Sequence, residues 1–97
     1  MPNRKYEKGR RAEYKTMRLL SDDGYTCIRT AGSHGHYDII AWDAYNILFI
    51  QVKVDCVPSS KEIQKIVETP FPKMRNCHRE IWVWETRKKE PEVLTIV

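Results

Sequence analysis

The chain has 97 residues, of which 41% are hydrophobic and 31% are charged. These values are typical of one small folded domain and exclude long disordered segments. A net charge of +4 favours a polyanionic partner. The sequence has no apolar run near the roughly 20 residues of a membrane span and no signal peptide, and its three cysteines are widely spaced. We therefore expect a single domain over residues 1–97, in the cytoplasm of a prokaryote or of a virus's host, with no membrane partner and no small-molecule cofactor.

The first predicted element is a helix over residues 5–21, which the turn signal Asp23-Gly24 ends. At about 100° per residue, its apolar side chains gather on one side and its cations on the other. Glu13 falls inside the apolar arc. Either its carboxylate reaches solvent from the edge of the arc, or it is paired with cations or a metal, because a buried unpaired charge is costly.

Three strands are expected next, over residues 25–30, 38–42 and 47–54. A loop with two glycines separates the first two strands, and a polar turn joins the other two into an antiparallel hairpin. The third strand has one wholly apolar side, whereas its other side ends in Gln51 and Lys53. The hairpin should place Asp38 beside Gln51 or Lys53, although a shift of one residue would reverse the faces.

The rest of the chain predicts a helix over residues 59–68 and strands over residues 79–85 and 93–97. Ser59 and Glu62 have the spacing of a capping box at the start of this helix. A right-handed crossover from the third strand to the fourth implies a mixed α/β (α+β) fold, in which helices flank a mixed central sheet. Trp82 and Trp84 share one side of the fourth strand, which favours the core or a subunit interface over stacking on bases.

Four polar side chains converge in this arrangement: Glu13, Asp38, Gln51 and Lys53. Two carboxylates and an amide oxygen suit Mg²⁺, for which Mn²⁺ can substitute. A lysine beside the metal can hold an attacking water or neutralise charge on a phosphate. This set of residues is what metal-assisted hydrolysis of a phosphodiester needs.

The order of these motifs resembles the PD-(D/E)xK nuclease superfamily, and within it the archaeal Holliday junction resolvases and their viral relatives. Residues 8–13, Lys-Gly-Arg-Arg-Ala-Glu, match a Lys/Arg-Gly-x-x-x-Glu helix. Residues 31–33, Ala-Gly-Ser, precede a matching Asp-Ile-Ile-Ala strand at residues 38–41, and residues 50–54 match the third strand. The resemblance covers roughly residues 4–55 and implies a restriction-endonuclease-like α-β-β-β-α-β core.

By this resemblance Glu13 is the acid on the helix, Asp38 the central metal ligand and Lys53 the catalytic lysine. Gln51 stands where the family has a second acid, and Ser33 matches a serine near the active site. The implied function is a Mg²⁺-dependent DNA endonuclease that cuts Holliday junctions or other branched DNA as a homodimer, with the Trp side of the fourth strand among its exposed apolar surfaces. The alternatives are a restriction-, repair- or transposon-type nuclease on duplex DNA and, because Gln51 removes a charge, a catalytically inactive nucleic-acid-binding module.

The residues expected to contact DNA are Arg10, Arg11, Ser33, His34, His36, Lys73 and Arg75. Cations on the outer side of the first helix either bind the DNA backbone irrespective of base sequence or form a solvated face of the helix. His34 and His36 either approach the scissile phosphate or the metal, or are exposed histidines of a loop.

Overall fold

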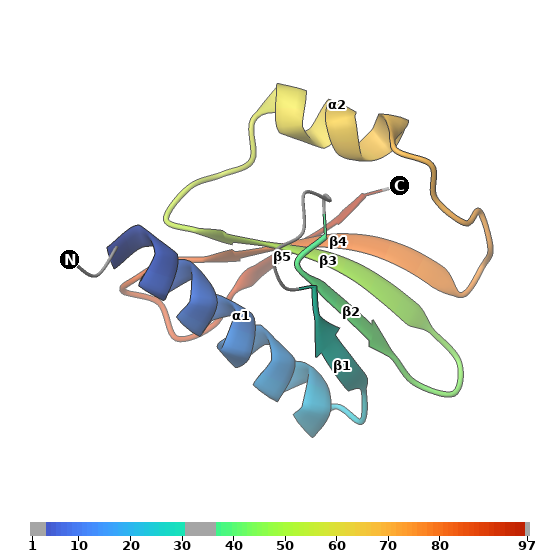
Figure 1. Ribbon diagram of the computed structural model, residues 1–97, viewed down its shortest axis with the longest axis horizontal. Coiled ribbons are helices and arrows are strands. Elements are labelled where there is room, and N and C mark those ends of the chain that lie inside the picture. The colour runs from blue at the N-terminus through green and yellow to red at the C-terminus, as the bar shows by residue number, and fades with distance from the viewer. Residues whose placement is uncertain (1–3, 31–36, 97) are drawn as a thin grey trace.

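The computed structural model describes residues 4–30 and 37–96, with side chains from residue 7 onward. Its helices and strands are α1 (Arg4–Asp22), β1 (Thr26–Arg29), β2 (Ile39–Trp42), β3 (Ile47–Val54), α2 (Ser60–Glu68), β4 (Cys77–Trp84) and β5 (Glu92–Ile96). The predicted order of elements is confirmed (Figure 1). β4 begins two residues earlier than expected because it pairs with β3 along its whole length, from Ile47 opposite Cys77 onward.

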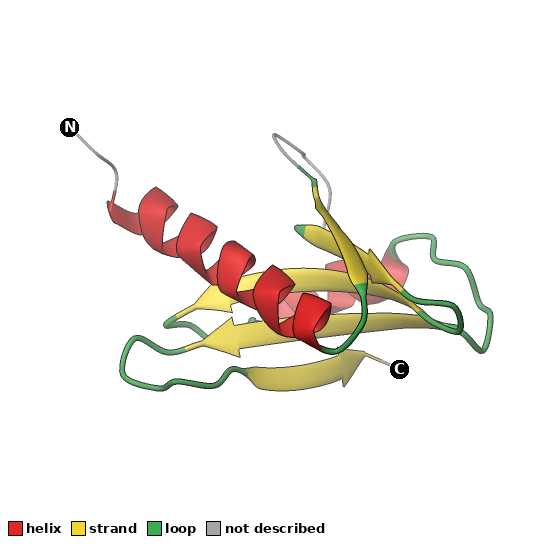
Figure 2. Cartoon of the chain, turned by 90° about the horizontal axis from the view of Figure 1, so that it is seen from below, coloured by secondary structure: helices red, strands yellow, loops and turns green. Residues whose placement is uncertain are grey.

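The five strands form one mixed sheet in the order β1-β2-β3-β4-β5. β3 and β4 are parallel, and the other neighbouring pairs are antiparallel. A parallel pair needs a long crossover, which α2 supplies between these two strands. Ser59 caps the start of α2 by accepting from the Glu62 N–H at 3.2 Å, as the capping box predicts. The two helices lie on opposite sides of the sheet (Figure 2), so the predicted mixed sheet flanked by helices is confirmed.

The larger core lies between α1 and the sheet. Trp82 and Trp84 belong to it, and both side chains are buried. The Trp84 indole donates to Thr16 Oγ1 at 2.8 Å, and the Thr16 hydroxyl donates to the Ala12 carbonyl at 2.7 Å. These bonds fix α1 on β4, because both polar groups are buried and need partners. The expectation that the Trp side of β4 remains exposed is therefore wrong: α1 covers it.

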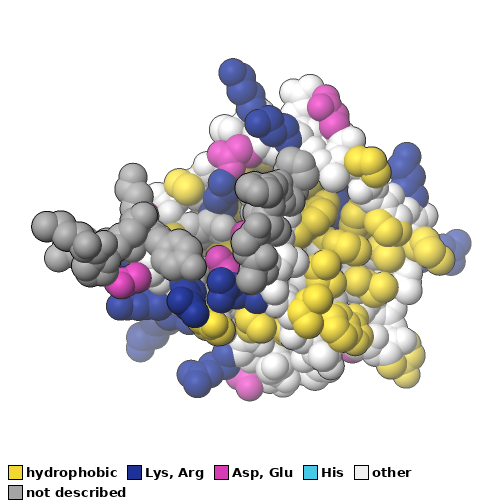
Figure 3. Space-filling view, in the orientation of Figure 1, with side chains coloured by type: hydrophobic (Ala, Val, Ile, Leu, Met, Phe, Trp, Pro, Cys, Tyr) yellow, Lys and Arg dark blue, Asp and Glu magenta, His cyan; other side chains and the backbone are white. Residues whose placement is uncertain are grey.

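The opposite face of the sheet is only partly covered by α2, whose buried Ile66 packs with residues of β4. Over β1, β2 and the start of β3, four apolar side chains of this face stay exposed or half-buried: Ile28, Ile40, Trp42 and Ile47. Ile28 pairs with Ile40 and Trp42 with Ile47 across the strands, so the four are neighbours, and we call them the β1–β3 apolar face. Figure 3 shows hydrophobic side chains gathered on the right of the view, over this part of the sheet.

Neither helix of the described part of the chain is long and apolar enough to cross a membrane. The three cysteines, Cys27, Cys56 and Cys77, are free thiols.

Candidate active site

The pairing of β2 with β3 fixes the position of Asp38. Its N–H donates to the Ile50 carbonyl at 2.8 Å, and its carboxylate Oδ2 accepts from the Val52 N–H at 2.8 Å. Ile39 lies opposite Ile50 in the ladder, so Asp38 comes next to Gln51, as the hairpin predicts. A backbone donor aimed at the carboxylate orients it as well as placing it.

Gln51 and Lys53 follow on β3 and project to the side of the sheet that carries α2. The Gln51 Oε1 atom is buried and accepts no hydrogen bond from any side chain or backbone group that the structure describes. Burying a polar oxygen without a partner costs about 1–3 kcal/mol, and such an atom in a native fold calls for an explanation. The Gln51 Oε1 atom is therefore a candidate ligand atom next to Asp38.

Glu13 approaches Asp38 from α1, on the other side of the sheet from Gln51 and Lys53. Its carboxylate Oε1 lies 3.0 Å from Arg29 Nε at the end of β1. Burial raises the pKa of Glu13, and the nearby charge of Asp38 raises it further, while Arg29 and Arg10 lower it. The two carboxylates are thus close enough to repel each other. Of the two explanations for Glu13, the geometry favours the paired carboxylate.

The pKa of Asp38 is also raised, chiefly by burial. The Val52 N–H, Lys53 and Arg29 act in the opposite direction by stabilising the ionised form. Asp38 therefore interacts with groups on both sides of the sheet, Arg29 on the α1 side and Lys53 on the α2 side. Two carboxyl groups whose pKa values are raised by burial, with a lysine beside one of them, mark this place as a candidate functional site.

Arg29 was not expected in this site from the sequence. Besides pairing with Glu13, its Nη1 donates to the Tyr14 hydroxyl at 3.2 Å, and its guanidinium lies 5.6 Å from the centre of the Tyr14 ring. Arg10 lies 5.9 Å from the same ring. Hydrogen bonds from Arg10 and then Arg29 lower the pKa of the Tyr14 hydroxyl. The alternation of Cys27 and Arg29 toward α1 is the signal by which Arg29 could have been found.

Glu62 is a second residue of the site whose role the sequence pattern does not predict. Its carboxylate forms an ion pair with the Lys53 ammonium. The hydrogen bond from Lys53 is the main cause that lowers the pKa of Glu62. The capping box with Ser59 fixes this part of α2, and so α2 holds a carboxylate against the predicted catalytic lysine. The capping-box pattern had located Glu62 on the helix but not its partner.

The remaining predicted residues are placed differently. Ser33, His34 and His36 lie outside the described residues. Arg11 is exposed, about 200° around α1 from Glu13 by helix periodicity. Lys73 and Arg75 are exposed in the connector between α2 and β4. That connector is held to the start of β3 by a bond from Ile47 N–H to the Asn76 carbonyl, roughly 15–20 Å along the strand from Lys53. The structure does not bring Lys73 and Arg75 to the carboxylates.

The donor set fits a divalent cation only if the amide takes part. Among residues 7–30 and 37–96, no three His, Cys, Asp or Glu side chains are grouped as a metal site. Asp38 and Glu13 supply two acids, and the unsatisfied Gln51 Oε1 supplies a third oxygen. Hard cations such as Mg²⁺ take carboxylate and amide oxygens together with water. The residues present are therefore compatible with such an ion, with one charge fewer than three acids would give.

Comparisons with known proteins agree with this geometry. The family model for the archaeal Holliday junction resolvase (Hjc) matches residues 4–68, which is more than half of the chain. A search of curated proteins gives no match. Among solved structures, Hjc of the archaeal hyperthermophile Archaeoglobus fulgidus, a Holliday junction resolvase, superposes with a TM-score of 0.71 at 24% identity, over 92% of this chain and 73% of that one.

The superposition shows that the two proteins share a fold, and the family match covers all four residues of the candidate site. The predicted resemblance to PD-(D/E)xK nucleases of the resolvase type is thereby confirmed. The chain belongs to the archaeal Holliday junction resolvase (Hjc) family.

Proposed function

We propose that this protein is a divalent-metal-dependent endonuclease that hydrolyses phosphodiester bonds in branched DNA, with four-way junctions as its preferred substrate and a 5′-phosphate product. The observation that carries the proposal is the position of Asp38, which the β2–β3 pairing sets between Glu13, Gln51 and Lys53. Residues 1–97 would act as one nuclease domain. The three free cysteines support a cytoplasmic location.

Asp38, Glu13 and Gln51 would hold Mg²⁺, with Mn²⁺ as a substitute. When bound, such an ion supplies Lewis-acid activation of water and neutralises charge on the phosphate. Lys53 stands beside Asp38, where its ammonium can orient the attacking water or stabilise charge that develops on the phosphate oxygens. Arg10 and Arg29 add positive charge beside Glu13. Gln51 brings no charge of its own, so the ion would be bound more weakly than by three acids.

Two other functions compete with this one. A restriction-, repair- or transposon-type nuclease would use the same side chains on linear duplex DNA. A nucleic-acid-binding module without catalysis would explain Gln51 as a lost acid, but not why its amide oxygen remains buried beside Asp38 and Lys53 without a partner.

Cleavage of a synthetic four-way junction and of linear duplex with the same sequences tests the proposal. In Mg²⁺ or Mn²⁺ the wild type should cut the junction faster than the duplex. Asp38→Ala and Lys53→Ala should each lower the rate at least about 100-fold, because each removes a group that acts on the reacting phosphate. Faster cutting of the duplex would favour the restriction-type enzyme. DNA binding without cleavage in either metal would favour the inactive module, and full activity of both variants would place the site elsewhere.

The ion pair with Glu62 predicts that this residue positions Lys53. Glu62→Gln should lower the cleavage rate about three- to tenfold, and Glu62→Asp should keep part of it, because a charge-assisted hydrogen bond orients better than a neutral one. Glutamine also serves in a capping box, so the melting temperature should change little. Glu68→Gln removes the same charge from the same helix, where the carboxylate accepts from Gln64, and is the matched control. Equal effects of the Glu62 and Glu68 variants would rule out positioning.

We also propose that the enzyme is a homodimer, because two symmetric cuts in a four-way junction require two active sites. The β1–β3 apolar face is the surface that supports this: Ile28 is 49% exposed and Trp42 38% exposed. Contiguous exposed apolar side chains on a folded protein are typical of an interface. A second copy of the chain is the partner that the two-cut reaction requires.

Analytical ultracentrifugation tests this assembly. The wild type should sediment as a dimer, and Ile28→Glu should sediment as a monomer with an unchanged circular dichroism spectrum, because a charge in an apolar interface is costly to desolvate. Val57→Glu introduces the same charge at a residue that is 76% exposed outside this face and should leave the dimer intact. A monomeric wild type, or a dimeric Ile28 variant, would contradict the proposed interface.

A further inference from the structure

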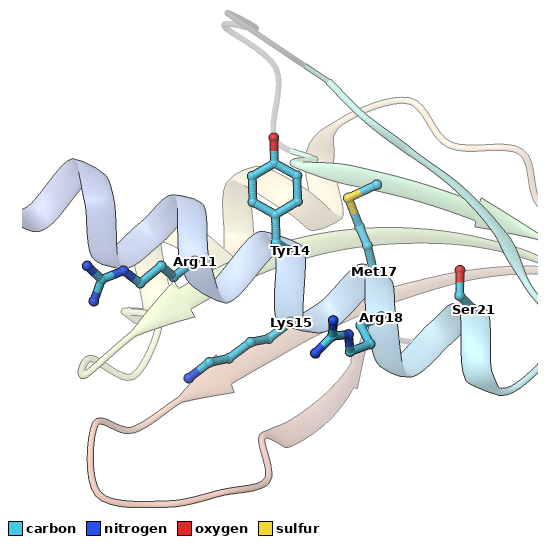
Figure 4. Close-up of a pocket in the computed structure, with 6 residues that line it drawn as sticks. All are labelled: Arg11, Tyr14, Lys15, Met17, Arg18 and Ser21. Carbon is cyan, nitrogen blue, oxygen red and sulfur yellow. The ribbon is translucent and has the colours of Figure 1, made fainter.

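A second concentration of positive charge lies away from the carboxylates. Arg11, Lys15 and Arg18 are spaced by four and three residues on α1, and all three are exposed. Figure 4 shows them extending from one side of the helix, whereas Tyr14 and Met17 project from another. Tyr14, which contacts Arg10 and Arg29 beside Glu13, lies at the border of this group and lines one hollow with Arg11, Lys15 and Arg18.

The turn between β4 and β5 brings further cations to the same side of α1. Together the helix and the turn line a hollow of about 410 Å³, whose cationic residues are Lys15 and Arg18 of α1 and Arg87, Lys88 and Lys89 of the turn. The Lys15 ammonium nitrogen lies 5.5 Å from the centre of a Trp84 ring, in a cation–π contact with β4. Within the described residues, Lys88 is the member of this set that has a carboxylate partner, Glu85 at 3.4 Å. Glu85, Glu90 and Glu92 flank the three cations of the turn and offset much of their charge, so the net positive charge of the surface comes mainly from the cations of α1.

We propose that this surface, formed by Arg11, Lys15 and Arg18 with Arg87, Lys88 and Lys89, binds the sugar–phosphate backbone of a second DNA arm and so distinguishes branched from linear DNA. The inference rests on the proposed nuclease function. Lysine and arginine side chains on such a surface suit the phosphates of the DNA backbone, which proteins contact irrespective of base sequence. We call the six residues the second-arm surface.

The geometry explains why a second arm, rather than the cleaved duplex, is the ligand. Lys15 is about 200° around α1 from Glu13, so the helix, about 10 Å across with its side chains, stands between the carboxylates and the second-arm surface. Duplex DNA is stiff, with a persistence length of about 150 base pairs, and does not wrap around a single helix. A branch point supplies two helical arms that diverge, one for each side of α1.

The test is fluorescence anisotropy with a four-way junction and a linear duplex of the same sequences, without divalent metal. Arg18→Ala/Lys89→Ala removes one cation from each element of the surface. This variant should raise the Kd for the junction about tenfold. In a plot of log Kd for the junction against the logarithm of the salt concentration, the slope should fall by about two, because two phosphate contacts are lost. The Kd for the duplex should change less than about twofold.

Lys61→Ala/Lys65→Ala is the matched control, since it removes two exposed cations from α2 on the opposite side of the sheet. It should affect both DNA forms equally and weakly. Three results would each overturn the inference. The Arg18/Lys89 variant could lose equal affinity for junction and duplex, or lose no more affinity than the control does. The wild type could also bind both DNA forms equally. Because binding is measured without metal, a junction preference that the variant loses would uphold it even if no DNA were cleaved.

Discussion

The structure depends on the antiparallel pairing of β2 with β3. The same ladder that buries Ile39 against Ile50 also aims the Val52 N–H at the Asp38 carboxylate. A shift of one residue would turn the apolar side of β3 outward and separate Asp38 from Gln51. Folding and site assembly thus share one constraint, so the core that stabilises the hairpin also holds the predicted metal ligand in place.

The partly buried carboxyl groups of Asp38 and Glu13 lower the free energy of unfolding at neutral pH, where they are ionised. Burial raises the folded-state pKa of Asp38 and Glu13, so the folded chain binds protons at these groups more tightly than the unfolded chain does. Stability therefore falls as pH rises from the ordinary pKa of each acid through its raised value, and at neutral pH the ionised pair opposes folding. Arg29 and Lys53 offset part of this cost, and a bound cation would offset more.

Alternation and capping signals were sufficient to predict the order of elements and a hairpin that brings Asp38 beside Gln51 or Lys53, but they left the exact register and the role of Glu13 open. These features follow from local periodicity and from short connections between neighbouring strands. The partners Arg29 and Glu62 could not be predicted in the same way, because each contact joins elements whose relative placement only the packed fold fixes. The burial of Trp82 and Trp84 was ambiguous for the same reason, since a strand pattern does not say which face a distant helix covers.

The central claim is that Asp38 and Gln51 hold a divalent cation, and calorimetric titration with Mn²⁺ tests it most directly. The wild type should bind, Asp38→Asn should abolish binding, and Gln51→Glu should tighten it about tenfold or more, because it adds a negative charge in a partly buried site. Both variants keep the size of the original side chain, so the fold should persist in each. Unchanged affinity in the Asp38 variant, or weaker binding with glutamate at position 51, would contradict the account.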